Sequence, residues 1–503
     1  MKTKKDKPLF MSFLICIVFL TTINSLNGQS VKTSNHQDSL VNSYNQVGLD
    51  IFKTSYNHID VDSNLLISPY SISVAMTMAY MGANGTTKEE MGEVLHLTSL
   101  SDFSINNSNL EIMDSLQTSG LDTMLIANSI WYRDDIQLVD DFINVCKDKY
   151  LSQVEELNFH NLNAKDIINE WVSDNTNGKI TELVDEVTPD NVLFIINALY
   201  FKGTWKKIFD ESATSNKAFT LSSGADVLVS TMAQMDTFKI IDNSEIKALE
   251  LPYSDGKYSM IIILPEINYG IDSLILNLDQ ETWSQWESEF IEHTVQVYLP
   301  KFSFDYNDNL MNEFDSLGMR EAFSGTADFT NLYAPGGIWI SKIMHKTLID
   351  VNEKGSEAAA ATEVEFSWGN NPILFKANRP FMFMIKNNVT GVVTFLGKVG
   401  KPIYNSNNSY LLNHLTNANK ELFDLYYDPM NHSIELISMQ NTSGFDNMRV
   451  DLIDLSGKLI KSWLINEPVS HRISLNLPES NPKMYLVRIS NHKMIQTKKI
   501  MVR

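Results

Sequence analysis

The spacing of apolar residues changes along the chain from a helical period to a strand period. Near the N-terminus, apolar residues recur at the three- and four-residue steps of one helix face, at Leu40, Tyr44, Val47, Ile51 and Phe52. The stretch Thr86 to Glu89 has the residue types of a capping box and predicts a second helix that starts there. Helices are therefore expected to dominate the first third of the chain.

Strand patterns follow in the middle of the chain. Two apolar runs between Ile246 and Leu264 are separated by Ser254-Asp-Gly256, which is the turn chemistry of a hairpin. The stretch Val295 to Phe304 alternates between apolar and polar residues and predicts one further strand. Helices first and long antiparallel strands later predict an α+β domain built around large sheets.

Composition divides the chain into four regions. Lysines precede a short apolar run, Leu9 to Leu20, so residues 1–28 are interpreted as a signal peptide with cleavage after Gly28. The mixed region covers 38–402, and 403–420 is an Asn- and Ser-rich linker. Alternating strands and turns at Ser456-Gly457 and Asn491-His492 predict a small all-β sandwich over 421–503.

Charge and cysteine content narrow the classes of partner. A formal net charge of -21 disfavours nucleic acid, anionic membranes and a heparin-like cofactor, because these polyanions would be repelled. Removal of the signal peptide leaves Cys146 alone, so no intramolecular disulfide is expected. The sequence shows neither a Cys/His cluster with metal-ligand spacing nor a Gly-rich phosphate loop. We expect a monomer without cofactor or metal.

The segment from Val351 to Asn371 is unusually long for a loop that has no Pro and almost no turn residues. With a period of two, one face carries Ser356, Ala358, Ala360, Thr362, Val364 and Phe366, and the other carries Glu357, Ala359, Ala361, Glu363, Glu365 and Ser367. Four successive alanines also suit a surface helix, but the alternation through Trp368 favours a strand. Gly355 provides a hinge, because a residue without Cβ reaches more backbone conformations.

Several segments in order resemble one known family, the serpins, which are suicide-substrate inhibitors of serine and some cysteine proteases. The resemblance covers about 39–402 and is carried by Asn64-Leu-Leu-Ile-Ser-Pro-Tyr-Ser71, Gly82-Ala-Asn-Gly-Thr86, Asn197-Ala-Leu-Tyr-Phe-Lys-Gly-Thr-Trp205, Leu299-Pro-Lys-Phe302, the segment 353–362, Asn378-Arg-Pro-Phe381 and Phe395-Leu-Gly-Lys398. It implies a serpin fold, with large mixed and antiparallel β-sheets, about eight to nine helices and an exposed reactive loop.

The resemblance also implies a mechanism. In this family a protease attacks the loop and forms an acyl-enzyme, and the cut loop then inserts into the main sheet and distorts the protease. Small residues after the hinge are typical of inhibitory members, and the hinge here comprises Glu353, Gly355, Ser356, Glu357, Ala358, Ala359, Ala360, Ala361 and Thr362. The chain is therefore expected to be an inhibitor and not an enzyme. The alternative is a non-inhibitory serpin that acts as a binding or storage module.

Four polar residues match the family's shutter cluster beneath the sheet, namely Ser68, Ser71, Asn197 and His345. A Ser, His and Asn set also permits a hydrolase, although no Gly-x-Ser-x-Gly elbow surrounds either serine. Trp205 matches the breach, where the loop first enters, and is equally compatible with a core aromatic.

Family spacing, counted forward from Glu353 and back from Pro380, reaches Gly369 both ways, so Gly369-Asn370 is the expected reactive bond. Gly369 has no side chain, so Trp368 and Phe366 are expected to carry the specificity. A papain-like cysteine protease or an elastase- or subtilisin-like serine protease is the expected target. A chymotrypsin-like enzyme cutting after Trp368 or Phe366 is the third possibility.

The C-terminal region resembles the sorting domains of bacterial type IX secretion cargo. The resemblance is carried by Leu425-Tyr-Tyr-Asp-Pro-Met-Asn431, by the turn within Val450 to Ile460, by the strand Met484 to Ile489 and by a basic end. An adhesive or spacer module is the alternative. The resemblance implies bacterial secretion machinery as a partner and a location outside the cell or on its outer surface.

Overall fold

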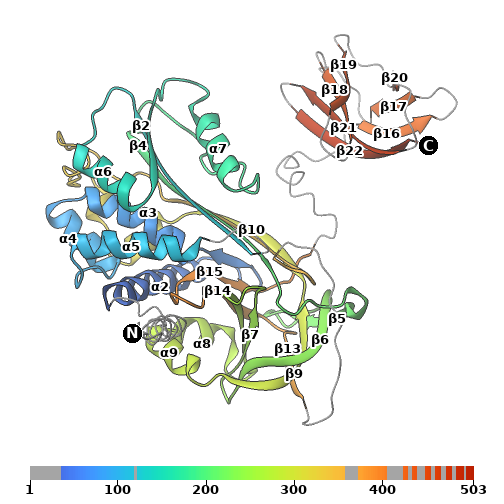
Figure 1. Cartoon of the computed structure of the whole chain (residues 1–503), viewed down its shortest axis with the longest axis horizontal. Helices are drawn as coiled ribbons and strands as arrows, with labels where there is room; N and C mark the ends of the chain where they lie inside the picture. The colour runs from blue at the N-terminus through green and yellow to red at the C-terminus, as the bar shows by residue number, and fades with distance from the viewer. Residues whose placement is uncertain are drawn as a thin grey trace, which may run out of the picture. The chain divides into compact units, whose positions relative to one another are not determined.

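The computed structural model describes residues 35–117, 122–356 and 372–404, and then 423–428, 433–438, 448–454, 459–465, 472–477, 483–491 and 494–502 (Figure 1). The expected signal peptide, most of the expected reactive loop and most of the linker lie outside these residues. The chain forms two compact units, which are divided between Tyr404 and Asn405.

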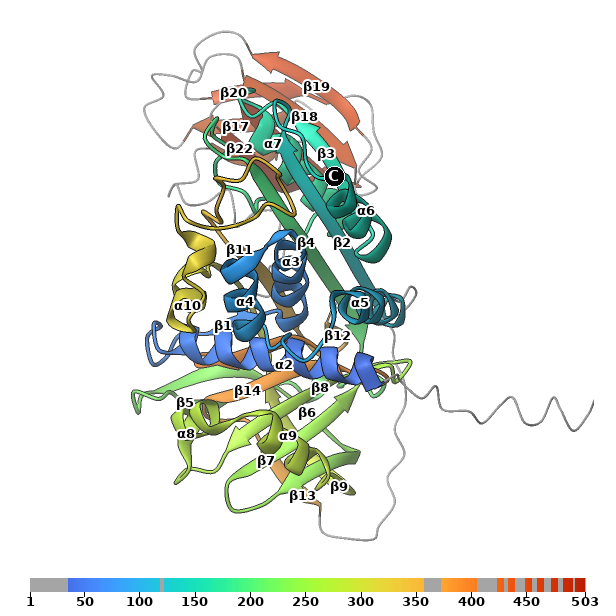
Figure 2. The same cartoon turned by 90° about the vertical axis from the view of Figure 1, so that its left-hand side faces the viewer.

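Nine α-helices are found among the described residues, all in the first unit: α2 (Asn35–Tyr56), α3 (Pro69–Gly82), α4 (Gly85–Val94), α5 (Asp102–Leu116), α6 (Asp140–Lys149), α7 (Ala164–Asn175), α8 (Gly270–Asn277), α9 (Gln280–Glu287) and α10 (Met311–Ser316). The apolar face predicted for α2 is buried, with Leu40 and Ile51 fully inaccessible. Helix α2 packs against α3 and α5, and Figure 2 shows it crossing between those helices and the strands β8 (Tyr258–Pro265) and β14 (Phe381–Asn387).

The predicted capping box at the start of α4 is wrong. The helix begins at Gly85 with Asn84 as its N-cap residue, and no side chain caps it. Thr86 therefore lies inside the first turn. The next residue, Thr87, is fully buried, and its hydroxyl oxygen accepts a hydrogen bond from the Asp328 backbone N–H at 2.9 Å. Thr86 thus fails as an N-cap because the helix already begins at Gly85, and the Thr87 hydroxyl serves a tertiary contact instead.

The largest sheet of the first unit has nine strands. Its main path is β1 (Leu65–Ile67), β15 (Val393–Val399), β14, β8, β7 (Ile246–Pro252), β6 (Asp226–Asp242), β9 (Ile291–Pro300) and β13 (Ile373–Lys376), and β5 (Ser215–Thr220) pairs with β6. The predicted hairpin is confirmed as β7 and β8, which turn at Gly256 with a φ of 73°. This positive φ suits a residue without Cβ.

The single strand expected from Val295 to Phe304 is two strands that belong to different sheets. Strand β9 pairs with β6 as far as Pro300, and β10 (Phe302–Asn309) pairs with β11 (Met344–Val351) from Phe302 onward. Lys301 is the residue at which the chain changes sheet. An alternating pattern continues through such a break because both halves have one buried face.

The remaining strands of the first unit form a four-stranded sheet and the β10-β11 pair. The four-stranded sheet has the order β12 (Gly355–Ser356), β4 (Leu193–Thr204), β2 (Thr123–Arg133) and β3 (Ser152–Leu157). Only two residues of β12 pair with the outer edge of β4, and β11 pairs only with β10 among the described strands. No described strand therefore joins β4 to β11 along their length.

The second unit is all strand in its described residues, as the sequence predicts. One sheet contains β16 (Phe423–Asp428), β17 (Ser433–Ser438) and β20 (Arg472–Asn476), and the other contains β19 (Leu459–Ile465), β18 (Met448–Asp454), β21 (Lys483–Asn491) and β22 (Met494–Val502). Val450 and Val487 are fully buried, and β16 contacts β22, so the two sheets share a core.

No described helix is long and apolar enough to cross a membrane. No group of three or more His, Cys, Asp or Glu side chains in the described part of the chain could hold a metal ion. Cys146 is buried in α6, and this burial raises the pKa of its thiol to about 12.

Candidate functional site

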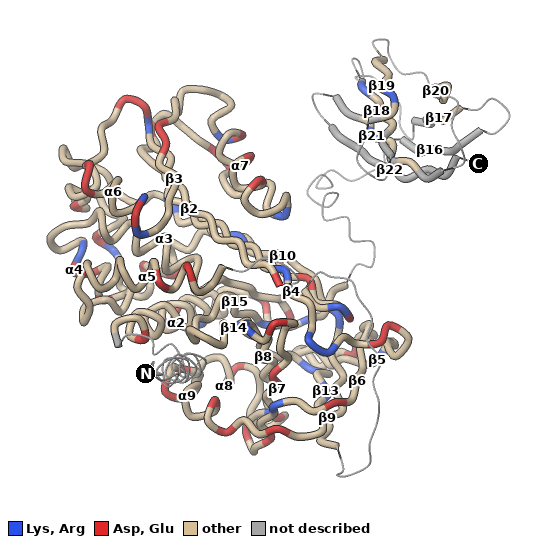
Figure 3. The backbone as a smooth tube through the Cα atoms, in the orientation of Figure 1, with Lys and Arg blue, Asp and Glu red and all other residues tan. Residues whose placement is uncertain are grey.

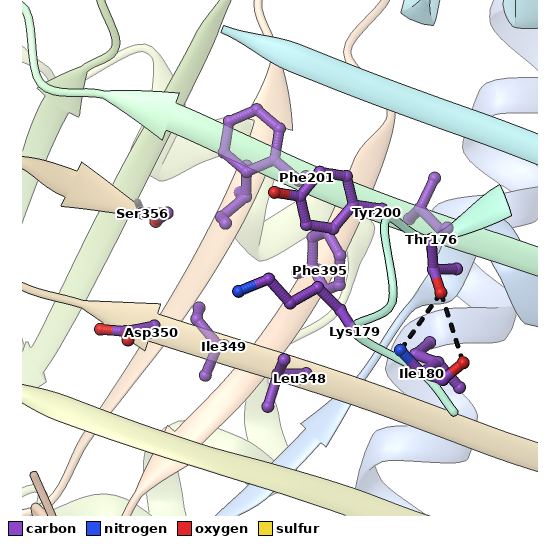
Figure 4. A pocket seen from close by; sticks show the side chains of 12 residues that line it. Thr176, Lys179, Ile180, Tyr200, Phe201, Leu348, Ile349, Asp350, Ser356 and Phe395 are labelled. Carbon is purple, nitrogen blue, oxygen red and sulfur yellow. Dashed lines mark hydrogen bonds between the residues drawn. The ribbon is translucent and has the colours of Figure 1, made fainter. Parts of the chain in front are cut away.

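A hollow lies between β4 and β11, beside the short strand β12. Its volume is about 530 Å³, including space open to solvent. Figure 4 shows Tyr200 and Phe201 of β4 on one side, Leu348 and Ile349 of β11 on the other, and Ser356 at one end. The hollow is therefore a mainly apolar slot between two strands that no described strand joins, and Lys179 and Asp350 are the charged residues of its lining.

A second hollow follows the first half of β4. It has a volume of about 1740 Å³, again including open solvent, and its lining includes residues 193–197 of β4, residues 337–345 and part of α3. The first hollow is lined by residues 199–201 of the same strand. Together the two hollows lie alongside residues 193–197 and 199–201, which make up most of β4.

The described hinge residues lie at the end of the first hollow that is next to the C-terminal end of β4. Gly355 and Ser356 pair antiparallel with Thr204 and Gly203 of β4. Gly355 has a φ of 136°, and a Cβ at this position would lie 2.1 Å from the Gly203 carbonyl oxygen. Only glycine fits here, for both steric and conformational reasons. The Ser356 side chain is buried, and its hydroxyl lies 3.0 Å from the hydroxyl of the buried Tyr253.

The other predicted loop residues are outside the described part of the chain. These are the hinge residues Glu357, Ala358, Ala359, Ala360, Ala361 and Thr362, the specificity residues Phe366 and Trp368, and the expected reactive bond Gly369-Asn370. Their assignments stay predictions.

Glu353, just before the hinge, is held by a buried ion pair. Its carboxylate lies 2.8 Å from the ammonium of Lys301, and the two side chains are 8% and 14% exposed. Its other oxygen accepts a hydrogen bond of 2.8 Å from the Thr214 hydroxyl. Burial raises the pKa of Glu353, but the hydrogen bonds from Lys301, the backbone and Thr214 outweigh it and hold the pKa below the ordinary value. The carboxylate therefore stays charged and fixes the base of the hinge.

Trp205 lies directly against the same segment. Its indole N–H donates to the Asn352 carbonyl at 2.9 Å, and its backbone N–H donates to the Lys354 carbonyl at 3.0 Å. The ring stacks on Tyr253 with a centroid distance of 4.6 Å and an angle of 14°. Trp205 is thus both a buried aromatic and a direct hydrogen-bond partner of the hinge.

The four predicted shutter residues are connected by hydrogen bonds. The backbone N–H of Ser68, which caps α3, donates to His345 Nε2 at 3.0 Å, and the Ser71 backbone N–H donates to the Ser68 hydroxyl oxygen at 3.2 Å. The Ser71 hydroxyl donates to the Asn197 side-chain oxygen. The Asn197 amide in turn donates to the side chain of Asn128 in β2 at 2.7 Å. This network ties α3 to β2, β4 and β11.

The His345 imidazole is not arranged as a base for a serine nucleophile. Burial lowers the pKa of His345 to about 3, so the ring is neutral near neutral pH. Its Nε2 accepts the Ser68 backbone N–H, so that lone pair is taken by a peptide group and not by a hydroxyl. The geometry therefore differs from a Ser-His pair of a hydrolase, in which the imidazole accepts from the nucleophile.

Sequence reasoning missed two side chains of this site. Lys301 was noticed only as part of a family motif, and Asn128 was not noticed. Asn128 is 2% exposed and donates to the Tyr150 carbonyl at 2.6 Å. The polar pair Asn128-Ser129 within the mostly apolar stretch Leu125 to Trp131 was the available signal, because a buried amide requires partners.

Comparison with known protein families matches both units. The model of the family Serpin (serine protease inhibitor) matches residues 42–402. The model of a secretion system C-terminal sorting domain matches residues 424–503. The second match supports export by type IX secretion, to the cell surface or the outside.

Individual proteins agree with the first match. A serpin-like protein of Methanosarcina acetivorans is 35% identical over 68% of this chain and 82% of its own length. Intracellular coagulation inhibitor 2 of Tachypleus tridentatus is 32% identical over 77% of this chain and 97% of its own. The native structure of the thermophilic serpin tengpin has a TM-score of 0.67 and 28% identity, and the match covers 74% of this chain and 96% of tengpin. The chain belongs to the serpin family and ends in a secretion sorting domain.

Proposed function

We propose that this serpin traps serine or cysteine endopeptidases as covalent acyl-enzymes by inserting its cleaved loop into the slot between β4 and β11. Serpins are mostly protease inhibitors rather than catalysts, and the family relationship supports binding to a target protease. The observation that carries the proposal is the antiparallel pairing of Gly355 and Ser356 with β4, which already directs the chain into the slot.

The pairing of β12 with β4 sets a register for the rest of the loop. Continued in the same antiparallel register, it places Ala358 opposite Phe201, Thr362 opposite Asn197 and Phe366 opposite Leu193. Leu193 is the first residue of β4. The strand from Ser356 to Phe366 predicted from alternation therefore has the length of the available edge.

The same register assigns the two faces of the inserted strand. Directly opposed residues of an antiparallel pair point to the same face of a sheet. Ser356 already points into the core at Tyr253, so Ala358, Ala360 and Thr362 would follow it inward. Small residues can pass Phe201 and Leu199 without displacing the core, whereas the alternate glutamates would point away from it.

Hydrogen-bond partners also favour insertion. In the free protein, no described strand pairs with the facing edges of β4 and β11 beyond Ser356. An inserted strand would supply N–H and C=O partners on both sides, each bond contributing about 1 kcal/mol net. Insertion would therefore release free energy that is able to displace an attached protease.

The target is proposed from the loop sequence. We place the reactive bond at Gly369-Asn370, with Trp368 and Phe366 in the neighbouring subsites of the protease. A glycine at the cut does not fill a trypsin-like pocket, which selects Lys or Arg. Trp368 suits a papain-like cysteine protease, which reads the residue before Gly369, and elastase- or subtilisin-like serine proteases are the other candidates.

The function is tested by incubating the full chain with papain-, elastase-, subtilisin- and chymotrypsin-like proteases. We expect an SDS-stable complex with at least one of them, together with a higher melting temperature of the cleaved protein. Mass spectrometry of the released fragment should show Asn370 as its first residue. A fragment with another first residue refutes the reactive bond. Loop cleavage without complex or stabilisation in every case would establish a non-inhibitory serpin.

A matched pair of loop variants tests the proposed register. In this register Ala358→Glu places a carboxylate inward opposite Phe201, and Ala359→Glu places the same group on the other face, opposite Tyr200. Burial of an unpaired charge costs several kcal/mol, so we expect Ala358→Glu to reduce the yield of covalent complex by about tenfold or more. Ala359→Glu should stay within about twofold of the parent. Equal yields from the two variants would contradict the register.

The shutter predicts an acid-dependent loss of stability. The unfolded chain binds a proton at His345 below its ordinary pKa of 6.5, whereas the folded chain does so only near pH 3. The contribution of His345 to the free energy of unfolding is therefore fully present above pH 6.5. It decreases as the pH falls, by about 2 kcal/mol at pH 5. His345→Gln keeps an acceptor for Ser68 but does not titrate. Denaturant midpoints of the two proteins should diverge below pH 6.5, and parallel profiles would refute this prediction.

The sorting domain is proposed to direct export together with the N-terminal segment 1–28. The family match at 424–503 supports recognition by the secretion machinery. Deletion of residues 421–503 should retain the protein in the periplasm, whereas the parent reaches the medium or the outer surface. Fractionation followed by immunoblotting measures this. Undiminished secretion of the truncated protein would show that the C-terminal unit is a spacer or an adhesive module.

A further inference from the structure

The chain returns to the hinge after its last strand in the first unit. Asn64 holds residues 400 and 401, because its side-chain oxygen accepts from the Gly400 and Lys401 backbone N–H groups at 2.9 and 3.0 Å. The Ser303 backbone N–H then donates to the Ile403 carbonyl at 2.7 Å. Ser303 is two residues beyond Lys301, so the segment 400–404 runs alongside the point where β9 gives way to β10.

This return places an aromatic ring on the lysine that holds the hinge. The Lys301 ammonium lies 4.1 Å from the centroid of the Tyr404 ring, while its other contact is the Glu353 carboxylate at 2.8 Å. An ammonium over an aromatic face is attracted by the ring quadrupole, and the attraction increases as water is excluded. Lys301 is thus held between a carboxylate and a ring.

Electrostatics keep the Tyr404 ring neutral. Burial raises its pKa to about 12, with further contributions from the Asp350 and Glu353 carboxylates. At physiological pH the phenol is therefore protonated. Figure 3 shows basic and acidic positions together near the end of β4.

Tyr404 lies outside the serpin match, which ends at residue 402, and before the sorting-domain match, which begins at residue 424. We propose that Tyr404 is a positioning residue for loop insertion. It holds Lys301 against Glu353, so the described segment 400–404 is part of the contacts that keep Gly355 and Ser356 at the end of the slot. The inference rests on the proposed insertion mechanism. It makes Tyr404, the last residue of the first unit, one of the residues that control insertion.

The test measures how fast a synthetic peptide with the sequence of residues 356–366 anneals into the intact full-length protein. Tyr404→Leu keeps an apolar side chain but removes the aromatic face, whereas Tyr404→Phe keeps the face and removes only the hydroxyl. We expect Tyr404→Leu to accelerate annealing roughly threefold to tenfold, because Lys301 loses its contact to the ring. Tyr404→Phe should anneal at the parent rate.

A double-mutant cycle separates this role from simple surface packing. In a Lys301→Met background, Tyr404→Leu should change the rate by less than about twofold, since the partner of the ring is gone. Lys217→Met is the matched control, because Lys217 also lies over a tyrosine ring, that of Tyr298 at 4.9 Å, but does not contact Glu353. In this background Tyr404→Leu should keep its full effect.

The outcomes distinguish a failure of the role proposed for Tyr404 from a failure of the proposed inhibitor function. If the parent anneals the peptide and gains stability on loop cleavage, but Tyr404→Leu matches its rate, the positioning role of Tyr404 is wrong and the inhibitor proposal stands. An equal acceleration with and without Lys301 would show that the ring acts by another route and also overturns the inference. If the parent neither anneals the peptide nor gains stability on cleavage, both proposals fail.

Discussion

The edge of β4 that faces β11, which no described strand joins beyond β12, is the constraint on which the rest of the structure depends. A sheet edge normally pairs, or is covered or charged, because its N–H and C=O groups need partners. Here β4 pairs with β2 along its length on one side and with only two residues of β12 on the other. The apolar hollows beside it are lined by the same strand. The fold therefore leaves this edge of β4 without a partner strand directly beside the described hinge residues Gly355 and Ser356.

Keeping that edge vacant requires contacts at both ends. At the hinge, a buried ion pair between Lys301 and Glu353 and the indole of Trp205 hold the chain where it enters. Farther along β4, the hydrogen bonds of Ser71, Asn197 and Asn128 connect the strand to α3 and β2. Both sets consist of buried polar groups, whose geometry is specific and whose loss is costly. Each can hold one arrangement firmly and still give way as a unit.

The sequence was sufficient for features that depend on periodicity. The buried face of α2, the β7-β8 hairpin and the all-strand C-terminal unit follow from local spacing. The capping box at Thr86 failed because α4 begins one residue earlier, at Gly85, so that Thr86 lies inside the first turn. The break at Lys301 was invisible because alternation continues across it. Lys301, Asn128 and Tyr404 gain their importance from contacts between residues far apart in the chain, which no local pattern encodes.

Under the proposed mechanism, the edge of β4 would also determine how the amount of protein relates to the amount of protease removed. A register that fills the strand from Gly203 to Leu193 leaves no position for a second insertion. Each molecule would then act once, and the protective capacity around a cell would be a matter of stoichiometry rather than of binding affinity. For such a protein, the rate of synthesis and export sets how large a burst of proteolysis can be absorbed.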